Sequence, residues 1–394
     1  MTNDVLLQSL HSHLAGWGLR QFTSDETYFQ SQRETLSPAE ITALHRQVEQ
    51  KRRGSCAEEV SFYDATTHPK ILPVLYSQRY DYYLAVGQRV ADRFGEARSI
   101  LDVGCGVGIL TTFYAGQYPD KTFVGIDRSP ASIARAQEQA KALGLTNVLF
   151  ECLDLDRAAP TGSFDVILAT HALVQAEQDS GIPSCSWRTF ERAGEIQQQA
   201  DFERRTGIGI RLDRLCSLLS SEGRMIVCEK TRQLARRVPL QRALAARDLA
   251  LIEQPELIRY RLVEEITDDG PFYVLGMNVS CRFLWDESPE TDEGPPFNCT
   301  KLKTESPDPD IPLYENHWPS AQLVWEQLHD KQLLKETTRQ ESDGRQLHVE
   351  LGEAEEGIYL YCANTFDQRQ LVIVEPARKG MLESYYEEII SCPP

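Results

Sequence analysis

The chain has 394 residues, enough for two or three domains with buried cores. Lys and Arg number 41 against 59 Asp and Glu, which leaves a formal net charge of −18. An acidic surplus of this size repels phosphate groups, so we expect neither broad nucleic-acid binding nor adhesion to an anionic membrane. No stretch approaches the roughly 18 apolar residues of a transmembrane helix, and the amino terminus lacks the features of a secretory signal.

The ten cysteines are scattered along the chain and include no CxxC pair. This spacing indicates neither a disulfide scaffold nor a zinc site. Cys152 and Cys228 stand in apolar runs, where a free thiol packs like a small hydrophobic side chain. The cysteine usage is typical of a reduced, cytoplasmic protein without a bound metal.

Residues 1–95 are predicted to be helical. Ser37, Pro38 and Glu40 form a capping box with proline at the first helical position, which predicts a helix ending near Arg53. A second, continuous helix is expected from near Pro69 to Phe94.

From residue 96 onward, short apolar runs alternate with helical segments. Near-continuous hydrophobicity is typical of strands that helices cover on both faces. The expected strands are Ser99–Val103, Thr122–Asp127, Asn147–Cys152, Phe164–Ala169 and Arg224–Cys228; the expected helices are Gly108–Gln117, Ser129–Leu143 and a long one ending near Leu219. The predicted fold class is α/β, with a doubly wound, mostly parallel sheet. A hairpin of Leu257–Val263 and Phe272–Cys281, turning at Thr267–Gly270, is expected at one edge.

Composition divides the chain into four expected parts. Residues 1–95 form a helical lid or cap, and residues 96–285 form the α/β domain. Residues 286–310 carry five prolines and eight acids against two lysines, a composition typical of a linker. Residues 311–394 are expected to form a small α+β accessory domain, with helices at Ser320–His329 and Met381–Ile390 and strands at Leu347–Leu351, Ile358–Cys362 and Leu371–Val374.

Three glycines alternate directly after the first expected strand, at Gly104, Gly106 and Gly108. Glycine permits positive φ and lets a ligand approach the backbone at the amino terminus of a helix. The dinucleotide fingerprint G-x-G-x-x-G requires glycine at position 109, where this chain has Ile109. Asp102 would repel a pyrophosphate beside this loop but suits an ammonium or a sulfonium.

Two further acids follow the next strands. Asp127 ends the second strand and can accept hydrogen bonds from two ribose hydroxyls. Asp154 follows the third strand and can accept from an adenine amino group. Because ligands of open α/β sheets bind outside the carboxyl ends of the strands, we expect these acids and Asp102 to converge there.

Residues from about 97 to 230 resemble the class I, Rossmann-like, S-adenosylmethionine-dependent methyltransferases. LDVGCGVG is similar to the first motif of that superfamily, GID to the second, and ECLDL and SFDVILATHAL to the third and fourth. The resemblance implies S-adenosyl-L-methionine as the cofactor. It implies that Asp102 and the glycines Gly104, Gly106 and Gly108 lie at its methionine part, Asp127 at its ribose, and Asp154 with the Leu155 backbone at its adenine. Cys105 and Arg128 are expected to bind the cofactor as well. Tyr63 resembles a residue of the helical lid that covers the cofactor in related enzymes.

Methyl transfer is a direct displacement for which the protein mainly supplies alignment, sometimes with a general base. His171, just past the fourth strand, is the candidate base, with a hydrogen-bonded wall histidine as the alternative. Glu177 and Asp179 can orient an amine or can be ordinary exposed loop acids. The paired-glutamate loop of protein arginine methyltransferases is not recognisable in THALVQAEQDSG.

We therefore expect an enzyme that methylates an O or N atom of a small-molecule acceptor, a metabolite or a natural product. One alternative is a peptide or protein methyltransferase that uses residues 311–394 to grip its substrate. Another is a cofactor-binding scaffold without catalysis. The sequence leaves the acceptor and the oligomeric state, including a homodimer, open.

Overall fold

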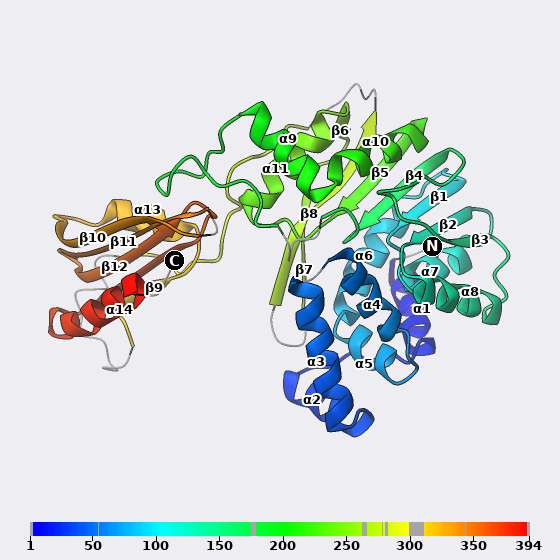
Figure 1. Ribbon diagram of the computed structural model, residues 1–394, viewed down its shortest axis with the longest axis horizontal. Helices are drawn as coiled ribbons and strands as arrows, with labels where there is room; N and C mark the ends of the chain where they lie inside the picture. Colours follow the sequence, from blue (N-terminus) through cyan, green and yellow to red (C-terminus); the bar gives the residue numbers. More distant parts are fainter. Residues whose placement is uncertain are drawn as a thin grey trace. The chain divides into compact units, whose positions relative to one another are not determined.

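The computed structural model describes residues 3–53, 55–174, 179–261, 266–277, 279, 283–298, 311–342 and 344–391 (Figure 1). The chain divides into two compact units. The first comprises Met1–Asp179, Ala200–Arg232 and Leu240–Trp285, and the second comprises Ser180–Gln199, Gln233–Pro239 and Asp286–Pro394. Within the described parts of the chain, every helix is too short or too polar to cross a bilayer.

The first unit begins with six helices. They are α1 (Asn3–Gly16), α2 (Asp25–Thr35), α3 (Pro38–Arg53), α4 (Cys56–Thr66), α5 (Ile71–Ser77) and α6 (Tyr80–Ala91). The capping box predicted at α3 is present, because the Ser37 backbone N donates to Glu40 Oε2 (2.7 Å) and the Glu40 backbone N donates to Ser37 Oγ (3.3 Å).

The prediction of one helix from Pro69 to Phe94 is wrong. The helix is interrupted between α5 and α6, where Arg79 leaves the helical region with φ −98° and ψ 17°. Ser77, at the end of α5, accepts a hydrogen bond from the distant Arg20 backbone N (3.0 Å). This long-range contact lies next to the break and has no counterpart in the local periodicity of the sequence.

The sheet of the first unit confirms the predicted α/β fold class. Its elements in chain order are β1 (Ser99–Val103), α7 (Ile109–Gln117), β2 (Thr122–Asp127), α8 (Pro130–Ala142), β3 (Val148–Cys152), β4 (Phe164–Thr170) and β5 (Leu219–Cys228). The strand order is β3-β2-β1-β4-β5-β8-β6, with β1 to β5 parallel and β8 antiparallel to both of its neighbours. The register aligns Val103 with Ile126 and with Ala169, so the carboxyl ends of β1, β2 and β4 meet at one edge.

The connections near β5 and β8 differ from the sequence prediction. The expected long helix is two helices, α9 (Ile196–Thr206) and α10 (Ile208–Leu218), because Gly207 between them adopts φ +72°. After β5 the chain forms the helix α11 (Leu234–Ala245). Three strands follow and complete this end of the sheet: the unpredicted β6 (Leu249–Leu251), β7 (Glu256–Arg261) and β8 (Ile266–Met277). The predicted hairpin forms between β7 and β8, but Thr267–Gly270 belong to β8 rather than to its turn.

One hydrophobic core joins the amino-terminal helices to the sheet. Leu10 of α1 and Val86 of α6 are fully buried with Ile100 of β1 and Leu168 of β4, and Phe94 lies in the same cluster. Burial of such side chains fixes the helices to the sheet by the hydrophobic effect. The helical region therefore forms part of the first unit instead of a separate domain.

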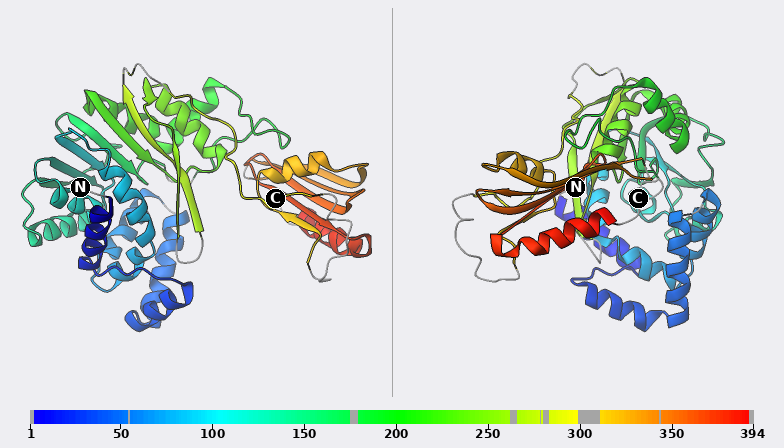
Figure 2. Two further views of the ribbon diagram at one scale, coloured as in Figure 1. Left: turned by 180° about the vertical axis from the view of Figure 1, so that it is seen from behind. Right: turned by 60° about the vertical axis from the view of Figure 1, so that its left-hand side comes forward.

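The second unit is built on a five-stranded antiparallel sheet in the order β10-β11-β12-β13-β9 (Figure 2). Its elements are β9 (Tyr314–Asn316), α13 (Ser320–Gln327), β10 (Gln332–Gln340), β11 (Gln346–Ala354), β12 (Gly357–Asn364), β13 (Arg369–Val374), the 3-10 helix η1 (Pro376–Arg378) and α14 (Lys379–Ser391). The sequence missed β9, which has three residues, and β10, whose side chains are almost all exposed and therefore lack the alternation that marks a strand.

Two segments that precede this sheet in the chain complete its core. The Trp187 ring stacks on buried His348 with 3.5 Å between ring centroids. Arg192 forms a buried ion pair with Asp367, which also accepts a hydrogen bond from the Ala235 backbone N (2.9 Å). The carboxyl-terminal unit therefore depends on residues 180–199 and 233–239 as well as on residues 311–391.

We predict that Asp367→Ala lowers the free energy of unfolding of the second unit by about 3–5 kcal/mol, because the substitution removes the carboxylate that pairs with the buried Arg192 charge. Urea unfolding followed by tryptophan fluorescence measures the change. The control Glu387→Ala breaks the exposed Lys335–Glu387 pair and should cost about 0–1 kcal/mol. Equal losses in the two variants would contradict the prediction.

Candidate functional site

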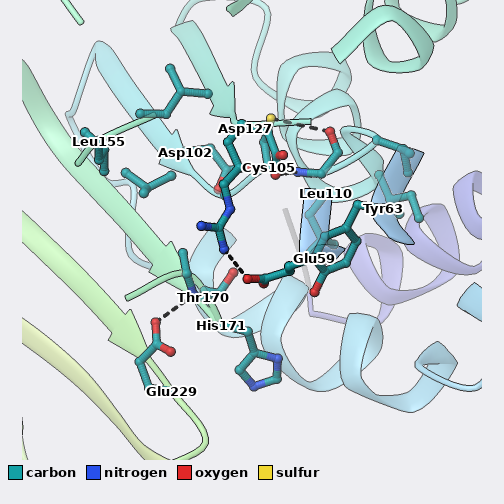
Figure 3. A pocket seen from close by; sticks show the side chains of 18 of the residues that line it. Glu59, Tyr63, Asp102, Cys105, Leu110, Asp127, Leu155, Thr170, His171 and Glu229 are labelled. Carbon is teal, nitrogen blue, oxygen red and sulfur yellow. Dashed lines mark hydrogen bonds and ion pairs between the residues drawn. The ribbon is translucent and has the colours of Figure 1, made fainter. Parts of the chain in front are cut away.

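A cavity of about 230 Å³ lies at the carboxyl ends of the parallel strands in the first unit (Figure 3). Its walls combine strand ends with residues of α3, α4, α5 and α6. The sequence-predicted residues that line it are Tyr63, Asp102, Gly104, Cys105, Gly106, Asp127, Arg128, Asp154, Leu155 and His171. Gly108 is not among the lining residues, and Glu177 lies outside the described residues.

The glycine loop between β1 and α7 supplies one wall. Gly104, Gly106 and Gly108 have φ values of +69°, +56° and +79°. A Cβ on Gly104 would stand 2.7 Å from the Ala172 Cβ, whereas the equivalent position on Gly106 has no described atom within 4 Å. Gly108 packs internally, since its Cβ would stand 2.9 Å from that of Ala136. The loop is therefore open to a ligand at Gly106.

Asp127 connects the glycine loop to the end of β2. Its Oδ2 accepts a hydrogen bond from the Gly106 backbone N (2.9 Å), and its Oδ1 accepts one from the Ser129 backbone N (2.8 Å). Burial raises the pKa of Asp127 above its usual range, although these two donors oppose the shift. Each carboxylate oxygen retains a further lone pair, so Asp127 can accept two more hydrogen bonds from a ligand.

Asp102 is a buried carboxyl group beside the same loop. Thr111 Oγ1 donates to its Oδ2 at 2.5 Å. Burial raises the pKa of Asp102 to about 7, and the charge of Asp127 adds to the rise while the Thr111 hydrogen bond opposes it. A cationic ligand group at this position would favour the ionised form of Asp102.

Asp154 and Leu155 follow β3 at the next strand end. Asp154 Oδ2 lies 3.6 Å from Arg157 Nε in a partly exposed pair. The Leu155 carbonyl accepts from Arg214, while its backbone N–H donates to no other described residue. A carboxylate and a neighbouring N–H provide an acceptor and a donor for a heterocyclic base.

Helix α4 is fastened across the end of β2. Arg128 Nη2 lies 2.5 Å from Glu59 Oε2, an ion pair visible in Figure 3. Ser129 Oγ donates to Asp64 Oδ1 (2.6 Å), one turn further along α4. These two contacts hold Tyr63, which lies between the two acids on α4, at the pocket. The amino-terminal helices α3 to α6, here termed the helical cover, thus line the pocket together with the glycine loop.

Arg79 is a pocket residue that the sequence analysis missed. It stands at the break between α5 and α6, amid the phenol groups of Tyr63, Tyr82, Tyr83 and Tyr260. Burial lowers the pKa of its guanidinium and these phenol groups raise it, with a net upward shift. Among the described residues no carboxylate pairs with Arg79. The guanidinium can therefore receive an anionic group of a ligand in its planar fork of donors. A lone arginine within the tyrosine-rich segment was the available sequence signal.

His171 lies on the far side of the glycine loop, directly after β4. Its backbone adopts φ +57°, and its N–H donates to the Cys228 carbonyl (2.8 Å). The imidazole stacks on the Tyr82 ring with 4.6 Å between centroids. Glu229, which the sequence analysis also missed, lines the same part of the pocket and is fully buried.

Residues 95–273 match a family model described as "Methyltransferase domain". The malonyl-[acyl-carrier protein] O-methyltransferase of Acetivibrio thermocellus is 32% identical over 25% of this chain and 38% of its own length. The ajmaline N-methyltransferase of Rauvolfia serpentina is 41% identical over 19% of this chain and 26% of its own length. The chain thus matches well under half the length of these relatives. The family resemblance expected from the glycine loop and the acids that follow it is confirmed by the family model.

Among solved structures, the magnesium protoporphyrin IX methyltransferase of Synechocystis PCC 6803 with bound S-adenosylmethionine is 14% identical. Its alignment covers 52% of this chain and 81% of that chain, with a TM-score of 0.35.

Proposed function

Because residues 95–273 form a class I, Rossmann-like methyltransferase domain, whose cofactor is S-adenosyl-L-methionine, we propose that this protein transfers a methyl group to an O or N atom of a small-molecule acceptor. The observation that carries the proposal is that Asp102, Asp127 and Asp154 line one cavity together with a glycine loop that is open at Gly106. Such a set of acceptors matches the ammonium, ribose and adenine of the cofactor.

We assign the nucleoside part of the cofactor to the ends of β2 and β3. The two free lone pairs of Asp127 suit the two ribose hydroxyls, and the neighbouring Arg128 holds the cover through Glu59. Asp154 suits the adenine amino group, with the Leu155 N–H as donor to a ring nitrogen.

We assign the amino-acid part of the cofactor to the glycine loop and the helical cover. The α-ammonium pairs with Asp102, beside Gly104 and Cys105. The α-carboxylate pairs with Arg79, the pocket guanidinium to which no described carboxylate is bound. This arrangement gives each charge of the amino acid a partner of opposite sign in the pocket lining.

On the acceptor side, we propose His171 as the general base. The unperturbed imidazole titrates near neutrality, as proton removal from an acceptor hydroxyl or ammonium requires. The relatives named above are an O-methyltransferase and an N-methyltransferase, which supports both acceptor atoms. Burial of the transfer site under α4 and α6 would exclude water and align donor with acceptor.

We place this reaction in the cytoplasm. The cysteines that the structure describes are free thiols, some of them exposed, such as Cys56 and Cys185. Exposed free thiols are typical of a reducing compartment.

A methyl-label screen tests the proposed function. The purified full-length chain is incubated with S-adenosyl-L-methionine carrying a labelled methyl group, in the presence of fractionated metabolite and peptide pools. The proposal expects label in a small-molecule fraction. Label in peptides alone would instead identify a peptide methyltransferase, and absence of saturable S-adenosylhomocysteine binding would overturn the assignment of the site.

We predict that Asp127→Ala raises the Kd for S-adenosylhomocysteine by about 10–150-fold, the equivalent of about 1.5–3 kcal/mol for hydrogen bonds to a charged group. Isothermal titration calorimetry measures the affinity. Asp120→Ala, at an exposed position before the opposite end of β2, is the matched control and should leave the Kd within twofold, that is, a change below about 0.5 kcal/mol. An unchanged Kd in Asp127→Ala would remove this residue from the cofactor site.

We predict that Arg79→Met weakens binding of S-adenosylhomocysteine by about 10–100-fold, because a charged hydrogen-bond partner of the α-carboxylate is lost. Binding of 5′-methylthioadenosine, which has no amino-acid part, should change by less than about twofold. Calorimetry with both ligands separates the two effects. The matched control is Arg89→Met, on α6 but outside the pocket lining. Equal losses of affinity for both ligands would show that Arg79 does not bind the α-carboxylate.

We predict that the affinity for S-adenosylhomocysteine rises with pH through about 7, where Asp102 ionises. Below that pH the neutral carboxyl cannot pair with the ligand ammonium, so the Kd should be about tenfold higher at pH 6 than at pH 8. Calorimetry in buffers of different ionisation enthalpy should also detect proton release on binding near pH 7. Asp102→Asn should abolish both effects, and a pH dependence that persists in this variant would assign it to another group.

A further inference from the structure

Glu229 places a buried carboxylate between the ends of β4 and β5. It follows directly after β5, and its side chain is fully buried. Its Oε1 accepts hydrogen bonds from the backbone N of Ala172 and of Leu173 (2.8 Å each), and its Oε2 accepts one from Val174 N (3.2 Å). Three successive N–H groups that converge on one carboxylate form an anion-binding nest.

The segment that this carboxylate holds starts in a strained conformation. His171 adopts φ +57°, the left-handed region, which is costly for a residue with a Cβ and persists only where its surroundings enforce it. The hydrogen bond from His171 N to the Cys228 carbonyl and the three bonds to Glu229 provide that enforcement. Hydrogen bonds to Cys228, the last residue of β5, and to Glu229, which follows it, therefore determine the backbone conformation after β4.

The same segment contacts both sides of the pocket. The Ala172 Cβ faces Gly104, where a Cβ would stand only 2.7 Å away. The His171 ring stacks on Tyr82 of the helical cover. A shift of residues 171–174 would therefore move both the His171 imidazole and the pocket wall beside the glycine loop. Figure 3 shows Glu229 and His171 on this side of the pocket.

The backbone of Glu229 also contacts β8, through Gly270. Gly270 N donates to the Glu229 carbonyl (3.0 Å), and a Cβ on Gly270 would stand 2.6 Å from that oxygen. The carboxylate thus belongs to a tightly packed strand junction.

We propose that Glu229 is a positioning residue for methyl transfer: its carboxylate fixes residues 171–174 and so aims the His171 imidazole at the acceptor beside the glycine loop. This inference rests on the proposed function. A purely structural role predicts that any loss of activity follows the loss of folded protein. A positioning role predicts lower turnover in protein that remains folded and still binds cofactor.

The test compares Glu229→Gln and Glu229→Asp with the matched control Glu222→Gln, an exposed position on the same strand. Glu229→Gln presents an amide N–H group to backbone donors, while Glu229→Asp keeps the charge on a shorter side chain. The first readout is the NMR spectrum of ring-labelled histidine, with His171→Ala used to assign the His171 signal. The second is calorimetric binding of S-adenosylhomocysteine. Neither readout requires a known acceptor.

The proposal expects the His171 ring signals, and their pH titration, to shift in both Glu229 variants and not in Glu222→Gln. The Kd for S-adenosylhomocysteine should stay within about threefold of the wild-type value. Unmoved His171 signals in folded Glu229→Gln protein would overturn the proposal. If Glu229→Gln does not fold, the same comparison with Glu229→Asp decides.

With the acceptor found by the label screen, kcat should fall about 10–100-fold in Glu229→Gln, and by less than about threefold when the same change is added to His171→Ala. If the losses in kcat of the two single variants add in the double variant, Glu229 does not act through His171 and the proposal is overturned. Failure of the proposed function has a different signature, because the wild-type chain would then transfer no methyl group while the NMR comparison would still report on the Glu229–His171 link.

Discussion

The hydrogen bond from the Gly106 backbone to Asp127 connects the two elements on which the candidate site depends. It ties the loop after β1 to the end of β2, two neighbouring strands in parallel register. Because this bond uses only one lone pair of the carboxylate, the contact that shapes the loop leaves Asp127 available to a ligand. The same residue therefore organises the protein and faces the cavity, and a change at Asp127 affects both.

The amino-terminal helices contribute part of the pocket lining at this sheet edge. Their core is continuous with that of the sheet, and the Glu59–Arg128 and Asp64–Ser129 contacts fasten α4 over the glycine loop. Packing at this edge has electrostatic consequences. Burial raises the pKa of Asp102, and Arg79 stands among phenol groups. In the proposed function, the zwitterionic end of the cofactor would supply the missing partner to both groups.

The described residues of the second unit include no cluster of metal-ligating side chains, and this unit is built from more than the carboxyl-terminal residues. Segments on either side of β5 contribute Trp187, Arg192 and Ala235 to its structure, where they meet His348 and Asp367. Removal of residues 311–394 would therefore expose buried groups in the remaining chain. Single substitutions such as those proposed above perturb the unit more cleanly than truncation does.

The sequence by itself determined the elements whose signal is local: the apolar runs of β1 to β4, the capping box at α3, and the glycines and acids that follow the strands. These patterns arise within a few residues, and the parallel α/β arrangement then brings Asp102, Asp127 and Asp154 to one edge. Only the tertiary structure decided which residues complete the site. Glu229 binds backbone groups 55–57 residues away, and Arg79 lines the pocket at the break between α5 and α6, next to a hydrogen bond that reaches back to Arg20. No local periodicity encodes such long-range hydrogen bonds, since they exist only once the strands have paired and the helices have packed.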